Sequence, residues 1–279
     1  MPGCTVVTGS AGRIGRVLRV IWGETLAGAP VLWSIRKPAQ GTDIVWDISK
    51  NDAPVFPEGT IFLHLAGKIR GDAEALAENR RSTLSLCKVA EATKTSHVVL
   101  MSSAAVYGPS TAPIPEAQRP DPGNDYGRAK WQAELAAQDV LSPDRLTILR
   151  LGNLAGADAL LSGAHAGPVV LDRIEGQPGG PERSYIGPRA LADVLRALIV
   201  RLQSGGALPP VLNVAQPPAL AMADLLRAAG ADWRFGPPRA AATPRVELSV
   251  DLLTSLVTVP EATAASVVQD LISLRGVWP

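Results

Sequence analysis

The feature that most constrains the fold is a regular alternation, over the first 150 residues, of short β-branched apolar runs with longer helical patterns. The runs that predict strands are residues 4–8, 30–35, 60–65, 97–101 and 146–149. The helices predicted between them cover residues 13–22, 72–93 and 125–140. Strands and helices in alternation predict βαβ units, that is, a parallel sheet covered by helices on both faces. Because such crossovers are right-handed, the expected fold class is α/β, a doubly wound Rossmann sheet.

Beyond residue 150 the alternation is less regular. A Gly/Pro-rich stretch spans residues 163–188, and after it the patterns predict a helix at 189–202, a strand at 211–214 and helices at 220–229 and 261–274. We therefore expect a dinucleotide-binding Rossmann core over residues 1–155. Residues 156–279 are expected to complete the sheet and to form a small C-terminal substrate-binding lobe.

Composition disfavours several classes of partner. The chain of 279 residues has a net charge of +1, so it has no broad field to attract nucleic acid or anionic lipid. No apolar stretch approaches the roughly 20 residues of a membrane-spanning helix, and the first apolar run, at Val6, leaves no room for a signal peptide. The two cysteines have no disulfide or zinc spacing, and His64, His97 and His165 have no metal-site spacing. We expect a cytoplasmic protein that acts on a small molecule, with no nucleic acid, membrane or metal partner.

The first predicted strand leads directly into a turn with three glycines in a GxxGxxG pattern. Glycine permits positive φ and lets the backbone approach a pyrophosphate closely, while the following helix start presents N–H groups and partial positive charge to phosphates. This context predicts a dinucleotide site, with a tight turn that binds no ligand as the alternative. The cofactor-binding residues expected in this turn are Gly9, Ser10, Gly12, Arg13, Ile14 and Gly15.

The residues after the second predicted strand distinguish the two nicotinamide dinucleotides. An acid there hydrogen-bonds the ribose 2′-hydroxyl of NAD, whereas a base receives the 2′-phosphate of NADP. This segment holds Arg36 and Lys37 and no acid, so the expected cofactor is NAD(P), with a preference for NADP. The alternative is that both side chains are solvated loop charges. Asp47 and Ile48, at the neighbouring strand end, are expected on the adenine side.

Tyr126 and Lys130 are the most informative pair in the sequence. Four residues apart on a predicted helix, they share one face. A nearby ammonium favours a phenolate, so we expect Lys130 to lower the Tyr126 pKa towards the range of efficient acid–base catalysis. Ser103, at the carboxyl end of the fourth predicted strand, lies at the sheet edge where such folds bind ligands. The alternatives are a chance surface pair and an ordinary turn serine.

With these features in order, the sequence resembles the extended short-chain dehydrogenase/reductase superfamily, specifically its NAD-dependent epimerase/dehydratase family. The glycine turn matches the family's motif, and Ser103, Tyr126 and Lys130 match its catalytic residues. The resemblance also implies cofactor-binding roles for Leu65, Ala66, Gly67 and Asn79, and substrate-facing roles for Ser103, Asn153 and Arg183.

The sequence also departs from the family's pattern. Dehydratases carry Asp-Glu directly after the catalytic Thr, but Ala104 and Ala105 stand here, so dehydration lacks its acid and base. The stretch that begins at Arg183 lacks the family's Asp and His, although this arginine remains a candidate for contact with a substrate phosphate. The family's late Arg-x-Gly-Asp pattern is absent, and Arg239 and Arg245 are loose substitutes. A diphosphate-sugar substrate is compatible with the sequence but is not required by it.

The sequence thus predicts an NAD(P)-dependent oxidoreductase that acts on a C–OH or C=O group of a sugar, nucleotide sugar or similar small molecule. In this hypothesis Tyr126 exchanges a proton with the substrate oxygen while the nicotinamide moves hydride. One alternative is a nucleotide-sugar epimerase that retains NAD. Another is a non-catalytic dinucleotide-sensing protein, which the presence of Ser103, Tyr126 and Lys130 together disfavours. The resemblance further suggests a homodimer paired through helices 72–93 and 125–140.

Overall fold

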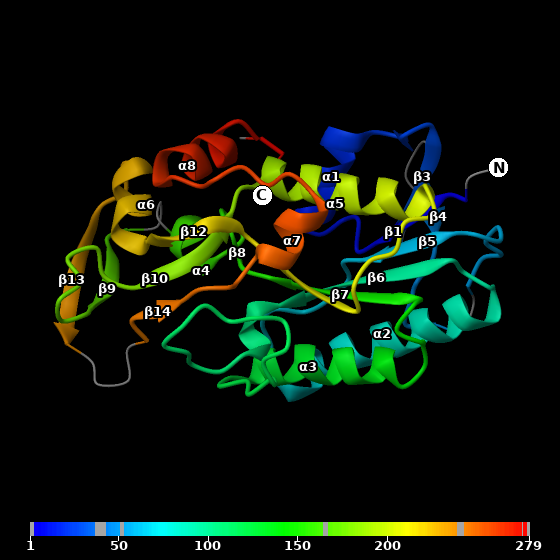
Figure 1. The fold of residues 1–279 in the computed structure, drawn as a ribbon, viewed down its shortest axis with the longest axis horizontal. Helices are drawn as coiled ribbons and strands as arrows, with labels where there is room; N and C mark the ends of the chain where they lie inside the picture. Colours follow the sequence, from blue (N-terminus) through cyan, green and yellow to red (C-terminus); the bar gives the residue numbers. More distant parts are fainter. Residues whose placement is uncertain are drawn as a thin grey trace. The chain divides into compact units, whose positions relative to one another are not determined.

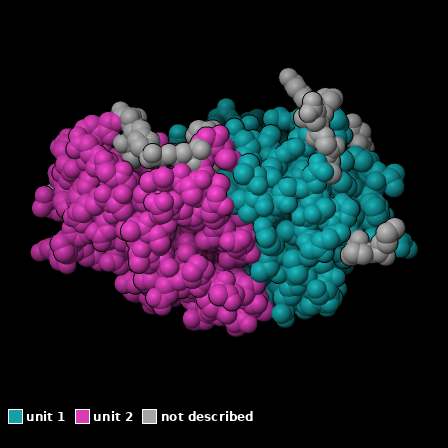
Figure 2. Space-filling view, turned by 90° about the horizontal axis from the view of Figure 1, so that it is seen from above, with its two compact units in different colours: residues 1–108, 119–150, 195–212 teal, residues 109–118, 151–194, 213–279 magenta. Residues whose placement is uncertain are grey.

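The computed structural model describes residues 3–36, 43–50, 53–163, 167–238, 243–274 and 276–277. The chain forms two compact units, coloured separately in Figure 2. The first unit comprises residues 1–108, 119–150 and 195–212, and the second comprises residues 109–118, 151–194 and 213–279. The chain therefore crosses between the units several times, and a single boundary near residue 155 remains a prediction.

The first unit is built on an eight-stranded sheet with strand order β11-β7-β6-β5-β1-β3-β2, and β4 pairs with β3. Strand β1 is parallel to β3 and β5, β3 is parallel to β4, β5 is parallel to β6, and the short β2 is antiparallel to β3. This mainly parallel arrangement confirms the predicted α/β class. The strands are β1 Thr5–Thr8, β2 Thr25–Leu26, β3 Ala29–Ile35, β4 Asp43–Val45, β5 Ile61–His64, β6 His97–Ser103, β7 Leu146–Leu151 and β11 Val211–Val214.

Helices lie on both faces of this sheet (Figure 1). Helices α1 (Arg13–Trp22) and α5 (Pro188–Gln203) lie on one side, and α2 (Ala73–Ala92) and α3 (Asp125–Gln138) lie on the other. The start of α2 is fixed by Asp72, whose side chain accepts the Ala75 N–H, and that of α3 by Asn124, which accepts the Gly127 N–H. Such side-chain caps satisfy N–H groups that have no partner within the helix.

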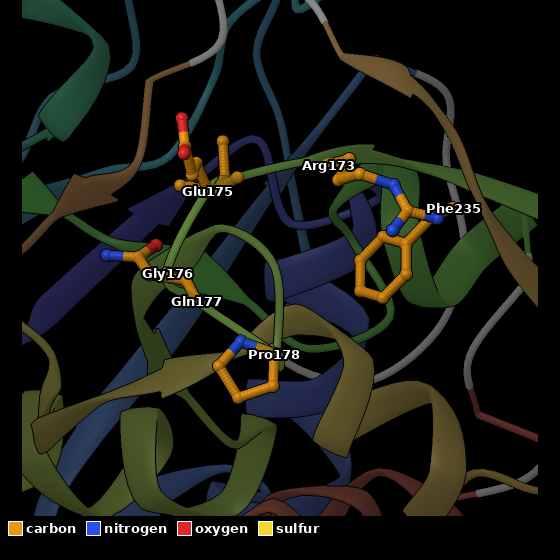
Figure 3. Close-up of a pocket in the computed structure, with 7 residues that line it drawn as sticks. Arg173, Glu175, Gly176, Gln177, Pro178 and Phe235 are labelled. Atoms are coloured by element: carbon orange, nitrogen blue, oxygen red, sulfur yellow. The ribbon is translucent and has the colours of Figure 1, made fainter.

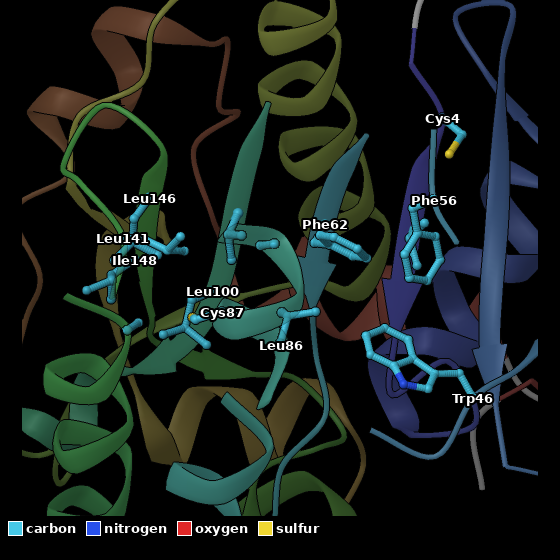
Figure 4. Packing of buried hydrophobic residues seen from close by; sticks show 14 residues of the cluster. Cys4, Trp46, Phe56, Phe62, Leu86, Cys87, Leu100, Leu141, Leu146 and Ile148 are labelled. Atoms are coloured by element: carbon cyan, nitrogen blue, oxygen red, sulfur yellow. The ribbon is translucent and has the colours of Figure 1, made fainter. Parts of the chain in front are cut away.

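Apolar residues from these strands and helices form one continuous core cluster (Figure 4). Trp46, Phe56 and Phe62 pack together, with ring centroids 5.0 to 6.1 Å apart. Strands β1, β5 and β7 are buried at every residue, as expected where helices cover both faces of a sheet.

The second unit contains two smaller sheets: a four-stranded sheet of order β12-β10-β14 with β8 beside β10, and a two-stranded sheet of β13 and β9. Two of its strands, β9 and β10, lie in the Gly/Pro-rich stretch for which the sequence predicted none. Their partners are distant in the chain, so no local pattern revealed them. The elements are β8 Asn153–Leu154, α4 Ala159–Gly163, β9 Val169–Arg173, β10 Glu182–Ile186, β12 Gln216–Ala221, α6 Met222–Ala228, β13 Trp233–Pro238, β14 Arg245–Val246, α7 Asp251–Leu256 and α8 Ala264–Ile272.

Among the described residues, none of the helices combines the length and apolar character needed to cross a membrane. Within the same residues, no group of three or more His, Cys, Asp or Glu side chains is arranged to hold a metal ion. His165, one of the three histidines considered for metal binding, lies outside the described part of the chain.

Candidate active site

The glycine turn between β1 and α1 is held by close backbone contacts. Gly9 has φ of +72°, and a Cβ placed on it would lie 2.5 Å from the Ala66 backbone nitrogen. A Cβ on Gly15 would lie 2.4 Å from the Cα of Ser10. At Gly12 the nearest atom would be the Gly9 carbonyl oxygen, 3.1 Å away, so this position tolerates a side chain better. Two of the three glycines are therefore required by the packing of the turn itself.

The start of α1 is suited to an anionic ligand. Gly12 is the N-cap residue in an extended conformation, no side chain is recorded as capping the helix, and its first turn carries no acid. Gly12 and Arg13 are exposed, and Ile14 is half-buried. Helix starts carry N–H groups without intrahelical acceptors and a partial positive charge, which together bind phosphate groups. The residues present therefore fit a dinucleotide pyrophosphate.

Ser10 has a different environment from the rest of this turn. Its side chain is fully buried, and its hydroxyl donates to the Ser34 carbonyl oxygen at 2.6 Å. The bond links the glycine turn to β3, the strand whose end was expected to distinguish NAD from NADP. Ser10 therefore positions the turn through its side chain.

Opposite charges meet where β3 and β4 end. Arg36 is exposed at the end of β3, and its charge helps to lower the pKa of Asp47. The largest contribution to this lowering is the hydrogen bond from the Ser49 hydroxyl to the Asp47 carboxylate, at 2.7 Å. Ile48 packs against the core cluster. Lys37, the second base of this segment, lies outside the described residues.

The loop after β5 connects the glycine turn to Lys130. Leu65 and Ala66 are half-buried, and the Leu65 N–H donates to the Thr8 carbonyl oxygen at 3.1 Å. A Cβ on Gly67 would lie 2.6 Å from the Asn79 side-chain oxygen and 3.6 Å from the Lys130 Nζ.

Asn79 fixes this loop. Its amide nitrogen donates to the Lys68 carbonyl oxygen at 2.9 Å and to the Leu76 carbonyl oxygen at 3.0 Å, and its oxygen accepts the Lys68 N–H at 3.1 Å. Both ends of the amide are thus bonded to backbone, so the Asn79 side chain holds the loop in place.

Ser103, Tyr126 and Lys130 lie together at the end of β6. The Ser103 and Tyr126 hydroxyls are hydrogen-bonded, and the Lys130 Nζ donates to the Met101 carbonyl oxygen at 2.6 Å. Tyr126 and Lys130 are one turn apart on α3, as their spacing predicts. The structure therefore brings these three residues together.

Burial controls the titration of this group. It raises the pKa of Tyr126, and the hydrogen bond from Ser103 opposes that rise. The expected lowering of this pKa by Lys130 is wrong, because desolvation of the phenolate outweighs the other influences and the ammonium is bonded to Met101. Burial also lowers the pKa of Lys130 to about 8, although the Glu134 carboxylate raises it. His64, completely buried near Lys130, has its pKa lowered to about 3, first by burial and then by the lysine charge.

Behind these residues lies a buried ionic group that was not predicted from the sequence. Arg150 donates to both carboxylate oxygens of Glu134 through its Nε, at 3.2 Å each, and through a terminal nitrogen at 2.7 Å. Its other terminal nitrogen donates to the Tyr107 hydroxyl at 3.0 Å, and the Ser102 hydroxyl donates to Glu134. A signal was present, because Glu134 follows Lys130 by the same four-residue step that separates Lys130 from Tyr126.

The second unit holds the remaining predicted residues, Asn153 and Arg183. The Asn153 side chain hydrogen-bonds with Tyr185, whose hydroxyl donates to the Asp158 carboxylate at 2.9 Å. Arg183 donates to the carbonyl oxygens of Glu182 and Thr243 at 2.7 and 3.0 Å, and burial lowers its pKa. Both side chains thus take part in the internal bonding of this unit.

One departure from the family pattern, the missing His of the stretch that begins at Arg183, has a structural explanation. Gly187 stands where the family has His, and a Cβ there would lie 2.1 Å from the Asp270 carboxylate. That carboxylate accepts N–H bonds from Arg189 and Ala190 at the start of α5. Arg245 forms ion pairs with two neighbouring glutamates, and Arg239 lies outside the described residues.

The second unit also contains a pocket of about 530 Å³ between the β9–β10 loop and β13 (Figure 3). The Arg173 guanidinium lies over the Phe235 ring, 5.4 Å from its centroid, and Gln177 and Pro178 line the pocket. A flat aromatic face with an adjacent cation is suited to a planar or anionic group.

Comparison with known proteins identifies a family and several similar structures. A model of the NAD-dependent epimerase/dehydratase family matches residues 57–207. The UDP-glucose 4-epimerase of Rhizobium meliloti (strain 1021) is 34% identical over 99 residues, and that of Rhizobium leguminosarum bv. trifolii is 40% identical over 79 residues. These stretches cover 34% and 27% of the chain, and only 30% and 24% of the two relatives.

Solved structures resemble the chain over nearly its whole length. The UDP-glucose 4-epimerase from Brucella ovis in complex with NAD has a TM-score of 0.80 at 20% identity, covering 98% of both chains. The Thermotoga maritima UDP-glucose 4-epimerase with UDP-glucose has a TM-score of 0.74 at 17% identity, with the same coverage. At such identities the similarity shows the Rossmann-type fold.

Proposed function

The chain belongs to the NAD-dependent epimerase/dehydratase family, and we propose that it oxidises and reduces a hydroxyl-bearing carbon of a nucleotide sugar with Tyr126 as the acid–base residue. The observation that carries this proposal is the contact between Ser103 and Tyr126 one helical turn from the buried Lys130. A hydroxyl pair beside an ammonium is suited to holding a substrate oxygen and moving its proton.

In this proposal each side chain has one task. Ser103 orients the substrate oxygen, Tyr126 takes the hydroxyl proton during oxidation and returns it during reduction, and Lys130 stabilises the phenolate that forms. Because burial opposes the phenolate, the lysine charge is needed at the moment of proton transfer. The nicotinamide cofactor, when bound, accepts and returns hydride. The glycine turn and the start of α1 hold its pyrophosphate.

Either NAD or NADP is compatible with the β3 end, and we propose that Arg36 admits the 2′-phosphate of NADP. The neighbouring Asp47 carboxylate opposes that phosphate, so the preference depends on the balance of the two charges. Titrating the purified protein with NADH and NADPH, followed by nicotinamide fluorescence, measures this balance. We expect Arg36→Ala to weaken NADPH binding by roughly 10- to 100-fold and to leave NADH binding within twofold, since one charged hydrogen bond contributes roughly 1.5–3 kcal/mol. Equal losses for both cofactors would contradict the assignment.

We propose epimerisation with a retained cofactor as the net reaction. The two sequence relatives are UDP-glucose 4-epimerases, and Ala104 and Ala105 supply no acid or base for dehydration. Stoichiometric NAD(P) retained through purification, together with interconversion of UDP-glucose and UDP-galactose, would support this reaction. Cofactor that is consumed in each turnover would instead favour the alternative, a reductase.

We further propose that the nucleotide portion of the substrate binds the second unit. The pocket beside Phe235 offers an aromatic face with the Arg173 cation, and Arg183 is a candidate partner of the diphosphate. Because both features belong to one unit, substitutions there are expected to change KM more than kcat.

Replacement of Tyr126 by Phe tests the proposed function. Removing the hydroxyl removes the proton carrier, so we expect turnover to fall by roughly 10²–10⁴-fold while cofactor affinity stays within twofold. Tyr185→Phe, which alters a buried tyrosine of the second unit, is the matched control and is expected to retain most of the turnover. Unchanged turnover in Tyr126→Phe would overturn the proposal.

A further inference from the structure

Three consecutive residues of β6 are each bonded to one residue of a single stripe on α3. The Met101 carbonyl accepts from Lys130 at 2.6 Å, the Ser102 hydroxyl donates to Glu134, and the Ser103 hydroxyl is hydrogen-bonded to Tyr126. The helical residues are spaced by four, so they lie on one face of α3. Two of these three bonds involve residues of the proposed acid–base group, Lys130 and Tyr126, and the third involves Glu134.

Glu134 is itself held in place. Its side chain is 2% exposed, and its carboxylate accepts three hydrogen-bond contacts from Arg150 on β7 besides that of Ser102. Arg150 is 5% exposed, donates to the Tyr107 hydroxyl and lies 4.7 Å from that ring's centroid. An ion pair this buried contributes little net stability, because desolvation offsets the attraction of its charges. Its effect on neighbouring groups is therefore of more interest than its contribution to folding.

We propose that Glu134 is a positioning residue for the acid–base group, which clamps the end of β6 to α3 through Ser102 and Arg150 and maintains the charge of Lys130. The inference rests on the proposed function in that Lys130 is taken to work as a cation beside Tyr126. It extends that function by assigning a role to a carboxylate that the hydride-transfer scheme leaves unused.

Within the described structure, the Glu134 carboxylate is the negative charge that raises the Lys130 pKa, and the Arg150 guanidinium bonded to that carboxylate partly offsets it. His64 at the end of β5 faces the lysine, and burial keeps it neutral. From the β5 loop and α2 come Gly67 and the neutral amide of Asn79, and β6 contributes the Met101 carbonyl. On α3, Tyr126 is a phenol whose pKa is raised, so it supplies no charge at neutral pH. Removal of the Glu134 charge should therefore favour the neutral amine.

The decisive experiment is a titration of Lys130 itself. Protein containing lysine labelled with ¹³C at Cε is titrated by NMR, and Lys130→Arg identifies the signal. We expect a midpoint near about 8 in the unaltered protein and a midpoint about one pH unit lower, or more, in Glu134→Gln. Glu134→Asp, which keeps the charge, should lie between the two. Asp125→Asn removes an exposed carboxylate from the same helix and should leave the midpoint within about 0.2 units.

An unchanged Lys130 midpoint in Glu134→Gln would overturn the proposal. If that variant does not fold, because Arg150 is left unpaired, the comparison is made between Arg150→Met and Glu134→Gln/Arg150→Met, which differ only in the Glu134 charge, and the same lowering of the midpoint is expected between these two. The titration requires no cofactor, substrate or turnover. A failure of Tyr126→Phe to reduce activity would therefore overturn the proposed function without altering this result. An unchanged midpoint alongside an inactive Tyr126→Phe would overturn only the role of Glu134.

Discussion

The two units organise their buried polar groups differently. In the first unit, Ser103, Tyr126 and Lys130 come from one strand and one helix that pack directly against each other. In the second, the Tyr185 hydroxyl bonds Asp158, 27 residues earlier, and Arg183 bonds the backbone of Thr243, 60 residues later. The first arrangement places hydroxyls and an ammonium beside one another, whereas the second bonds a tyrosine to a carboxylate and an arginine to backbone carbonyls. Substitutions in the first unit should therefore mainly affect chemistry and cofactor binding, and those in the second should mainly affect stability and substrate affinity.

The largest expected effect concerns the glycine turn of the first unit. Gly9→Ala places a Cβ at positive φ and within 2.5 Å of the Ala66 nitrogen, so the turn must shift. We expect a loss of at least about 3 kcal/mol of unfolding free energy, or at least about 100-fold in NADH affinity, or both. Urea unfolding and NADH fluorescence measure the two quantities.

Two other glycines are controls for this prediction. Gly12→Ala meets one oxygen at 3.1 Å and should cost less than half as much stability. Gly230→Ala, in the second unit, has φ of +63° with no neighbour within 4 Å, so it isolates the backbone strain of about 1–2 kcal/mol. If Gly9→Ala lowered the unfolding free energy no more than Gly230→Ala does, the close backbone contacts of the glycine turn would contribute nothing beyond the strain of a positive φ.

The same contrast explains how much could be predicted from the sequence. Helix α1 matches its predicted bounds, and the spacing of Tyr126 and Lys130 placed both on one face, because these features depend on local periodicity. Strands β9 and β10 were missed because their pairing partners lie far along the chain and their apolar runs are short. The predicted direction of the Tyr126 pKa shift was also wrong, because the pKa is raised and not lowered. Spacing reveals a neighbouring charge, but it does not reveal how far a helix face is removed from water.

A second prediction concerns the cost of burying Lys130. Its pKa is about 8 in the folded protein against 10.5 for an ordinary lysine, so between these values the unfolded chain binds more protons than the folded one. Stability should consequently rise with pH through this window, by up to about 3 kcal/mol at about 1.4 kcal/mol per pH unit.

Lys130→Met removes the titrating group and should flatten that rise. Urea unfolding of both proteins at several values between about pH 7.5 and 10.5 gives the comparison, and the difference between the curves cancels groups common to both. Parallel curves would mean that the first unit holds this lysine without a desolvation cost.

A third prediction separates stability from chemistry in the two units. Tyr185→Phe leaves the buried Asp158 carboxylate without one donor, and we expect a loss of about 1–3 kcal/mol of unfolding free energy. Tyr126 is only partly buried and has the small Ser103 as its partner, so Tyr126→Phe should cost less than about 1 kcal/mol while it reduces turnover far more. Thermal unfolding and turnover are measured on both variants. If Tyr126→Phe lost more stability than Tyr185→Phe, or Tyr185→Phe lost more turnover than Tyr126→Phe, the assignment of chemistry to the first unit and of stability to the second would be wrong.

The smallest expected effect tests the pocket of the second unit. Arg173→Met removes the cation above Phe235, and if the pocket receives part of the nucleotide, KM should rise about two- to fivefold with kcat within twofold, as expected for roughly 0.5–1 kcal/mol at an exposed site. Arg227→Met is the matched control. The Arg227 guanidinium also lies over an aromatic ring of β13, 5.1 Å from the centroid of Trp233, but neither residue lines the pocket. A KM that rises equally in both variants would indicate that such contacts stabilise β13 in general. A rise confined to Arg173→Met would assign substrate affinity to this pocket and leave the chemistry to the first unit.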